Sequence, residues 1–184
     1  MKIISRPSLD KLTTVGITSR CEGLIEVRDV KDLEETSNFF KKKGVRGIFL
    51  GNGSNVVPGS NFLDLFLVRL FNNKLDIVKE DKDHLIIEVG GGVPLKTLIM
   101  WAVKRGYMGL ENLIGIPGTV GGAVCMNAGS YGTEIFDAIS KLTLWHEDKG
   151  LVTYVKDELD FSYRKFISPF PKGLWCVFFH NYIF

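Results

Sequence analysis

The sequence predicts a chain of mixed helices and strands that forms two lobes and carries three glycine-rich loops. Two helical patterns with capping residues and several short apolar runs predict the mixed fold. A polar turn, Asn72-Asn73-Lys74, separates two of the predicted strands and marks the boundary. We therefore expect a first lobe over residues 1–72 and a second over residues 73–184, lengths that suit two small lobes.

The first lobe is predicted to contain a strand–helix–strand unit. Residues 24–28 read as a short strand, and Asp29 is placed to cap a helix over Val30–Lys43. Three lysines suit the C-terminal end of that helix, and Gly44 stops it. Residues 46–50 form the next strand, and the connection through a helix favours parallel strands.

The second lobe is predicted to contain one longer helix among several strands. Pro94 suits the first turn of a helix that runs to Arg105, and Gly106 ends it. Asp148-Lys149-Gly150 is a hairpin turn between two strands. The predicted strands that begin before this turn cover residues 64–70, 75–79, 84–89 and 139–145, and those after it cover residues 151–155, 161–164 and 174–179.

The composition excludes several classes of protein. Hydrophobic residues make up 45% and charged residues 24%, as in ordinary soluble globular proteins. A net charge of +2, from 23 basic and 21 acidic residues, does not favour nucleic acid or a membrane surface as a partner. Cys21, Cys125 and Cys176 lack metal-type spacing, so we expect reduced thiols, no metal site and a cytoplasmic location. The first residues show no apolar run, so we expect no signal peptide.

The most informative segment is residues 115–129. It holds five glycines, a proline and an asparagine but no charged side chain. Glycine at this density indicates a backbone that approaches something closely or repeatedly adopts positive φ. We interpret the segment as buried against a large ligand, with peptide N–H groups as its main hydrogen-bonding groups. The alternative is a packing loop between lobes.

Two further glycine-rich loops follow predicted strands. Gly51-Asn52-Gly53-Ser54-Asn55 is suited to an anion-binding turn in which N–H groups hold phosphate oxygens. It is not a dinucleotide fingerprint, because Val56 stands where a third glycine belongs, and no Gly-Lys-Ser/Thr follows. The alternative is a surface turn. Gly90-Gly91-Gly92 either approaches the same ligand or simply ends a strand.

Taken together, three uncharged loops spread over the chain imply a long ligand with a pyrophosphate and an aromatic ring system. A dinucleotide cofactor fits that description.

These residues also resemble a known family. The 51–55 and 115–129 loops, together with Gly109-Leu110-Glu111-Asn112-Leu113, Tyr131-Gly132-Thr133-Glu134-Ile135 and Phe161-Ser162-Tyr163-Arg164, look like the UDP-N-acetylenolpyruvoylglucosamine reductase (MurB) family of peptidoglycan synthesis. Thr13-Thr14-Val15-Gly16-Ile17 resembles its opening segment, so the match runs in order through nearly the whole chain.

The resemblance implies a two-lobed α+β FAD-binding fold of the vanillyl-alcohol oxidase / p-cresol methylhydroxylase type, with FAD held between FAD-binding lobes. It also implies a reductase that takes a hydride from NADPH and reduces the enolpyruvyl double bond of a UDP-sugar substrate, giving UDP-N-acetylmuramate.

The family's functional residues carry over position by position. Arg164 matches the catalytic arginine, whose guanidinium stabilises negative charge on the carboxylate side of the substrate. Tyr163 is interpreted as packing, and Trp101 and Trp145 as core. The implied cofactor-binding residues are Gly51, Asn52, Gly53, Ser54, Asn55, Gly115, Ile116, Pro117, Gly118, Gly121, Gly122, Ala123, Asn127, Ala128 and Gly129.

The chain departs from the family after these motifs. Family members are implied to continue into a third, substrate-binding domain, which supplies a proton-donating serine and a glutamate that assists the arginine. We find no equivalent of either motif in these 184 residues, so we expect the C-terminal substrate-binding domain to be absent. Two alternatives stay open: a flavin subunit of another oxidoreductase, and a flavin-binding fragment without catalytic activity.

Overall fold

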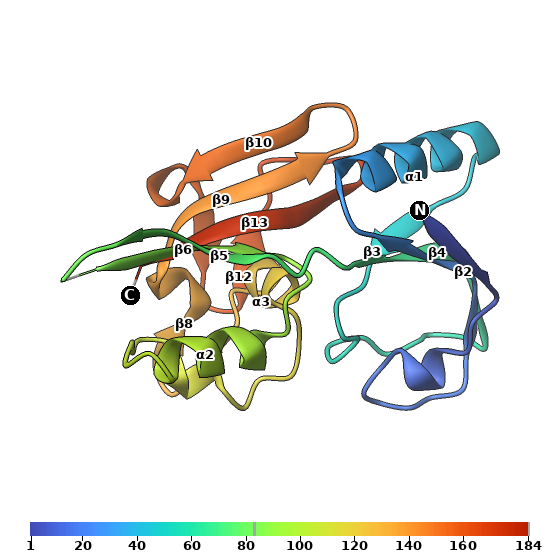
Figure 1. Ribbon diagram of the computed structural model, residues 1–184. Coiled ribbons are helices and arrows are strands. Elements are labelled where there is room, and N and C mark those ends of the chain that lie inside the picture. The colour runs from blue at the N-terminus through green and yellow to red at the C-terminus, as the bar shows by residue number, and fades with distance from the viewer. Residues whose placement is uncertain (83, 184) are drawn as a thin grey trace. The chain divides into compact units, whose positions relative to one another are not determined.

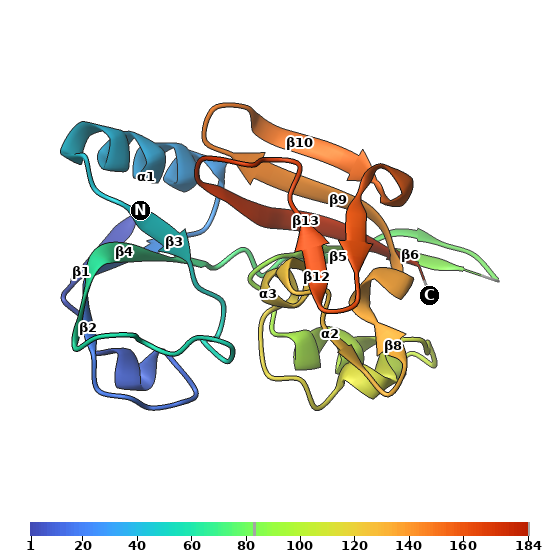
Figure 2. The same ribbon diagram turned by 180° about the vertical axis from the view of Figure 1, so that it is seen from behind.

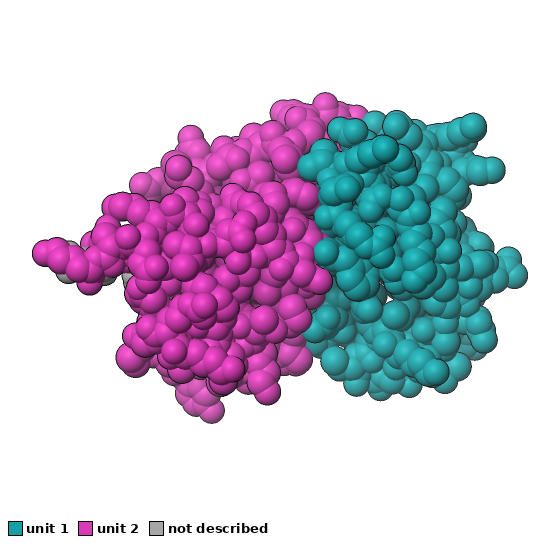
Figure 3. All heavy atoms as spheres, viewed as in Figure 1, with its two compact units in different colours: residues 1–71 teal, residues 72–184 magenta. Residues whose placement is uncertain are grey.

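The computed structural model describes residues 1–82 and 84–183, and it divides into two compact units, Met1–Phe71 and Asn72–Phe184. Figure 3 shows the two units in different colours. Each contains its own sheet and helices, so the fold is of the α+β class.

The first unit is built on a four-stranded sheet in the order β1-β2-β4-β3. β1 pairs antiparallel with β2, whereas β2 and β3 both pair parallel with β4 (Figure 1). The strands are β1 (Lys2–Ser5), β2 (Arg20–Val27), β3 (Gly47–Phe49) and β4 (Phe62–Leu70), with a short 3-10 helix, η1 (Leu9–Lys11), and one α-helix, α1 (Val30–Lys43).

The helix predicted for this unit is confirmed at both ends. α1 begins after Asp29, whose Oδ1 accepts a hydrogen bond of 2.8 Å from the main-chain N–H of Asp32. It ends at Gly44, which has φ +65°. The predicted parallel direction of the flanking strands is also confirmed, but they are not neighbours because β4 lies between them.

The sheet of the first unit has apolar side chains on both faces. α1 covers one face (Figure 1), where Leu33 and Phe40 are buried. On the other face a small cluster surrounds η1, and its buried members are Leu9, Cys21, Leu24, Leu50 and Leu67. The glycine-rich loop that follows Leu50 therefore adjoins this closely packed cluster, of which Leu50 is a member.

The second unit is built on a five-stranded sheet in the order β10-β9-β13-β6-β5, in which all neighbours are antiparallel. Its strands are β5 (Leu75–Glu80), β6 (Leu85–Gly90), β9 (Ile139–His146), β10 (Gly150–Val155) and β13 (Trp175–Ile183). Each of these was predicted from the sequence within a few residues. Two short hairpins accompany the sheet: β7 (Gly129–Ser130) with β8 (Thr133–Glu134), and β11 (Asp160–Ser162) with β12 (Lys165–Ile167).

Two α-helices, α2 (Leu95–Val103) and α3 (Val120–Cys125), lie on the same side of this sheet (Figures 1 and 2). Three 3-10 turns complete the unit: η2 (Glu111–Leu113), η3 (Ile135–Asp137) and η4 (Lys156–Glu158). In the described part of the chain no helix has both the length and the apolar character needed to cross a membrane.

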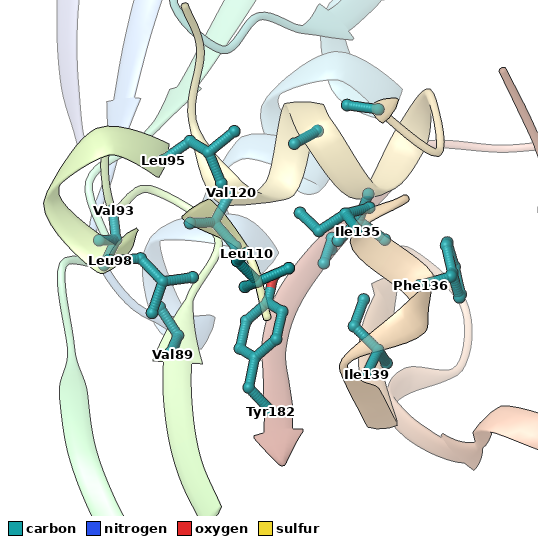
Figure 4. Packing of buried hydrophobic residues seen from close by; sticks show 14 of the residues in the cluster. Val89, Val93, Leu95, Leu98, Leu110, Val120, Ile135, Phe136, Ile139 and Tyr182 are labelled. Carbon is teal, nitrogen blue, oxygen red and sulfur yellow. The ribbon is translucent and has the colours of Figure 1, made fainter. Parts of the chain in front are cut away.

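The core of the second unit lies between the sheet and these helices. In Figure 4 the fully buried ring of Tyr182, from β13, points toward Leu110 and Val120. Leu95 and Leu98 of α2 belong to the same buried cluster. Trp145 is buried as predicted, and Trp101 is half-buried against the cluster with the Arg105 guanidinium 4.0 Å from its ring centroid.

Two predictions for the second unit are wrong. Residues 161–164 do not form one strand, because β11 ends at Ser162 and Arg164 lies in the turn before β12 with φ +57°. The 115–129 segment is not a continuous loop either, since it contains α3. The glycines at 121 and 122 hid that helix from a pattern-based reading, because glycine disfavours helix interiors.

Candidate functional site

The loop over residues 51–55 leaves β3 and forms a tight turn on the first unit. Gly53 has φ +64°, and a Cβ there would lie 2.2 Å from the carbonyl oxygen of Leu12. Only glycine fits this position without moving the backbone. The carbonyl of Gly53 also accepts a hydrogen bond of 3.3 Å from the N–H of Thr14, so the predicted opening segment supports the loop.

Several main-chain N–H groups of this loop have no main-chain acceptor in the described chain. Within residues 1–82 and 84–183, the N–H groups of Asn52, Gly53 and Asn55 donate to no main-chain carbonyl. Asn52 and Asn55 are exposed, and Gly53 is buried. Neighbouring N–H groups without main-chain acceptors are able to bind an anion. The loop is therefore suited to phosphate oxygens.

The 90–92 loop serves the packing of the second unit. A Cβ on Gly90 would lie 2.2 Å from the carbonyl oxygen of Asn72, so the chain passes too closely for any side chain. The N–H groups of Gly91 and Gly92 donate to the carbonyls of Phe178 and Asn72, both at 3.0 Å. These contacts correspond to the strand-ending alternative for this loop.

The 115–129 segment is also largely integrated into the core. α3 begins after Thr119, whose Oγ1 accepts from the N–H of Gly122 at 3.2 Å. The N–H of Gly121 donates to Gly91 O at 2.9 Å, and a Cβ on Gly121 would meet that oxygen at the same distance. Gly121 therefore allows α3 to approach the 90–92 loop closely.

The site residues predicted in this segment divide by burial. The exposed or half-buried ones precede α3 or lie on it, namely Gly115, Ile116, Pro117, Gly118 and Gly122. The buried ones are Gly121, Ala123, Asn127, Ala128 and Gly129. The exposed and half-buried residues can contact a ligand, whereas the buried residues support the backbone of the segment from inside the protein.

Asn127 is the centre of a buried hydrogen-bond network. Its side chain is fully buried, and its Nδ2 donates to Oε2 of Glu134 at 2.6 Å and to the carbonyl of Ser162 at 2.9 Å. Both acceptors fix the orientation of the amide, because the opposite orientation would place an oxygen against two oxygens. The network joins the end of α3 to β8 and to the β11–β12 hairpin. Its Oδ1 is buried and has no hydrogen-bond partner among the described residues.

The same two hairpins line an open cavity of about 360 Å³. Its charged lining residues are Glu134 and Arg164, and the other lining residues are Gly129, Ser130, Tyr131, Gly132, Thr133 and Tyr163. Arg164 is exposed, and within the described chain no carboxylate lies within ion-pair distance of its guanidinium. A free guanidinium at a cavity is suited to an anionic substrate group.

Positive φ values occur at two residues that line this cavity, Tyr131 and Arg164, and at Asn127, which donates to the lining residue Glu134. Asn127, Tyr131 and Arg164 have φ values of +39°, +50° and +57°, which side chains other than glycine rarely adopt. Such strain persists only where the surrounding structure imposes it, and it gathers at functional sites. Tyr163 is 74% exposed, so its interpretation as a packing residue is wrong. It occupies the turn, with the Arg164 guanidinium 5.7 Å from its ring centroid.

Two thiols of the second unit, Cys125 and Cys176, are held neutral by their surroundings. Burial raises the pKa of the Cys125 thiol to about 12 and that of Cys176 well above its usual range. All three cysteines are free. Among the described residues no cluster of potential metal ligands occurs.

Two residues of these sites were missed by the sequence reading. The sequence motif that contains Glu134 indicates no role for it, yet Glu134 lines the cavity and accepts a hydrogen bond from Asn127. Arg69 was included in a predicted strand, yet its Nη2 donates to the carbonyls of Gly51 at 3.3 Å and Leu12 at 3.5 Å. Arg69 is the one basic residue of this strand, in which Asp64 is the other charged residue, and that was the available signal.

Each unit by itself offers surface that fits one part of a flavin dinucleotide. In the first unit, the N–H groups of Asn52, Gly53 and Asn55, which donate to no main-chain carbonyl of the described chain, suit a pyrophosphate. In the second unit, the start of the 115–129 segment offers uncharged backbone and the half-buried side chain of Ile116 to a ring system.

Comparison with known proteins supports this reading. The profile of the "FAD binding domain" family matches residues 21–154. The chain is 38% identical over 172 residues to the UDP-N-acetylenolpyruvoylglucosamine reductase of Aquifex aeolicus, which covers 94% of this chain and 57% of that protein. The chain spans about half the length of several such relatives.

Solved structures give the same result. The reductase (MurB) from Thermus caldophilus aligns with a TM-score of 0.80 and 31% identity, over 98% of this chain and 61% of that one. A VAO-type flavoprotein from Myceliophthora thermophila C1 aligns with a TM-score of 0.65 at 14% identity, over 90% of this chain and 32% of that chain, which shows a shared fold.

The resemblance to the reductase family and the vanillyl-alcohol oxidase type of fold, both predicted from the sequence, are confirmed. With a family profile matched over more than half of its length, the chain belongs to the family of FAD-binding domains.

Proposed function

We propose that this chain is the FAD-binding portion of a UDP-N-acetylenolpyruvoylglucosamine reductase that uses NADPH. The observation that carries the proposal is the presence, on one fold, of an anion loop at residues 51–55 and a free arginine at the cavity. The likeness to the Thermus caldophilus reductase over 98% of the chain supports it. FAD, when bound, would supply the hydride chemistry.

Each group of residues has a distinct role in this proposal. The N–H groups of Asn52, Gly53 and Asn55 bind the pyrophosphate, with Gly51 and Ser54 completing the turn. Gly115, Ile116, Pro117, Gly118 and Gly122 lie beside the flavin ring. The buried residues Gly121, Ala123, Asn127, Ala128 and Gly129 hold this surface in place from behind.

Arg164 is proposed as the catalytic residue. Hydride addition to an enolpyruvyl group builds negative charge toward its carboxylate. A fixed guanidinium that makes bidentate contact stabilises that charge as it develops. Asn127 holds the backbone of the hairpin that carries Arg164, because it donates to the carbonyl of Ser162, two residues earlier.

The test is NADPH oxidation by the FAD-loaded chain, with and without UDP-N-acetylglucosamine enolpyruvate. Oxidation that depends on the UDP-sugar, and that Arg164→Gln slows by about 100-fold or more, is expected for a reductase. Lys165→Gln, which removes a neighbouring exposed cation, is the control.

A second function is supported by one observation: the chain spans 57% of the Aquifex aeolicus relative and 51% of another. It is a flavin-binding portion that needs further sequence, or a partner chain, for turnover. Stable FAD binding without NADPH oxidation would favour it, and turnover of a different acceptor would favour a subunit of another oxidoreductase.

A further inference from the structure

Arg69 lies directly beneath the 51–55 loop in the first unit. It occupies β4, and its Nη2 donates to the carbonyl of Gly51 at 3.3 Å and to that of Leu12 at 3.5 Å. Its side chain is half-buried, and its Nε is buried with no hydrogen-bond partner among the described residues. The guanidinium therefore has donor capacity beyond the two carbonyls that it contacts.

The positive charge of Arg69 lacks a direct counterion. In the described part of the chain no carboxylate lies within ion-pair distance of it. Glu26, its partner in the register of β2 with β4, instead pairs with Lys2 at 3.2 Å and Arg28 at 3.8 Å. Burial lowers the pKa of Arg69, and the field of Glu26 offsets this only in part. A half-buried cation without a counterion is costly unless an anion completes the site.

The polarity of the adjoining loop points to where that anion belongs. The loop carbonyls face the protein, since Gly51 O accepts from Arg69 and Gly53 O accepts from the N–H of Thr14. The N–H groups of Asn52, Gly53 and Asn55 remain without main-chain acceptors in the described chain. An anion at these N–H groups would meet the field of the guanidinium behind them, in a region screened less than open water.

We propose that Arg69 is the cation of the phosphate site formed by residues 51–55. It holds the loop through the Gly51 carbonyl and balances the charge of a bound pyrophosphate. This inference rests on the proposed function for the identity of the ligand, FAD, but it concerns only residues of the first unit. The competing interpretation is that Arg69 merely joins Leu12 to the loop and has no effect on anion affinity.

The test compares ligands that differ in charge. FAD carries a pyrophosphate and riboflavin carries no phosphate, so a charge effect must separate them. Dissociation constants are measured for both with the wild-type chain, Arg69→Gln, Arg69→Lys and the control Arg46→Gln, which removes an exposed arginine of the same unit. We expect Arg69→Gln to weaken FAD by about 10-fold or more and riboflavin by less than about 2-fold.

Two further measurements test whether the charge of Arg69 is responsible for an effect on FAD affinity. Raising the salt concentration should weaken FAD binding to the wild-type chain and change it less for Arg69→Gln. Arg69→Lys should retain part of the FAD affinity, because it keeps the charge but loses the planar geometry. Equal losses for FAD and riboflavin, or no loss for either, would overturn the inference in favour of the purely structural role.

Inorganic pyrophosphate separates this inference from the proposed function. It should raise the unfolding temperature of the wild-type chain and of Arg46→Gln, but not that of Arg69→Gln. A chain that binds pyrophosphate in this way but not FAD would refute the proposed function and leave the phosphate site standing. Absence of pyrophosphate stabilisation in the wild type would refute the site itself. If Arg69→Gln does not fold, the salt dependence of the wild type and Arg69→Lys decide.

Discussion

Replacement of Asn127 by alanine should destabilise the second unit and loosen the Arg164 turn. The bond from its Nδ2 to the Glu134 carboxylate, 2.6 Å long, contributes about 2 kcal/mol, and the 2.9 Å bond to the Ser162 carbonyl about 1 kcal/mol. Alanine at φ +39° costs about 1 kcal/mol more. Removing the buried, unpartnered Oδ1 returns about 1 kcal/mol, which leaves a net loss of about 3 kcal/mol.

Urea unfolding followed by tryptophan fluorescence measures this loss in the correct unit, since Trp101, Trp145 and Trp175 all lie in the second unit. Asn127→Gly is the matched control, because glycine removes the same bonds but tolerates positive φ. It should be about 1 kcal/mol more stable than Asn127→Ala.

The order of the turn at Arg164 is measured by its rate of cleavage by trypsin, which cleaves after arginine. Without the bond to Ser162, cleavage after Arg164 should become faster in Asn127→Ala under native conditions. An unchanged midpoint together with an unchanged cleavage rate at Arg164 would refute the argument that Asn127 holds this turn.

Three other predictions follow from the structure. Burial lowers the pKa of His180 from 6.5 to about 4, so the neutral imidazole contributes about 3 kcal/mol to the free energy of unfolding above about pH 6.5, and this contribution is lost as the pH falls toward about 4. Over that interval His180→Phe should lose less unfolding free energy than the wild type, and parallel curves for the two proteins would contradict the assignment. Gly53→Ala, whose Cβ would meet Leu12 O at 2.2 Å, should weaken FAD binding by about 10-fold or more. Gly59→Ala, with open space around its Cβ, should bind FAD with the wild-type affinity, and equal FAD affinities for the two variants would show that the loop tolerates displacement. Gly121→Ala would place its Cβ 2.9 Å from Gly91 O and should lower the free energy of unfolding in urea by about 2 kcal/mol. Gly115→Ala, whose Cβ meets nothing within 4 Å, should lower it by less than about 0.5 kcal/mol.

Much of the secondary structure was predictable because its signals are local. Asp29 and Gly44 mark the ends of α1, and a hairpin turn separates β9 from β10. The position of β4 between β2 and β3 was not predictable, since strand order depends on contacts between distant parts of the sequence. The pairing of β13 with both β6 and β9 is of the same kind.

The site was predictable in outline but not in its internal roles. The glycines at 51 and 53 indicated an anion loop, and the N–H groups of Asn52, Gly53 and Asn55 have no main-chain acceptor among the described residues. The glycines at 90, 91 and 121 gave the same sequence signal, yet they serve contacts of the chain with itself. Glycine reports a close approach but not the partner, so only the fold separates ligand from protein.

If this chain forms a FAD site, its visible absorbance spectrum after incubation with FAD and desalting should show bound flavin. We expect a retained flavin spectrum in the wild type and in Gly59→Ala, and a diminished one in Gly53→Ala. A folded wild-type sample that retains no flavin would show that these 184 residues do not form a FAD site.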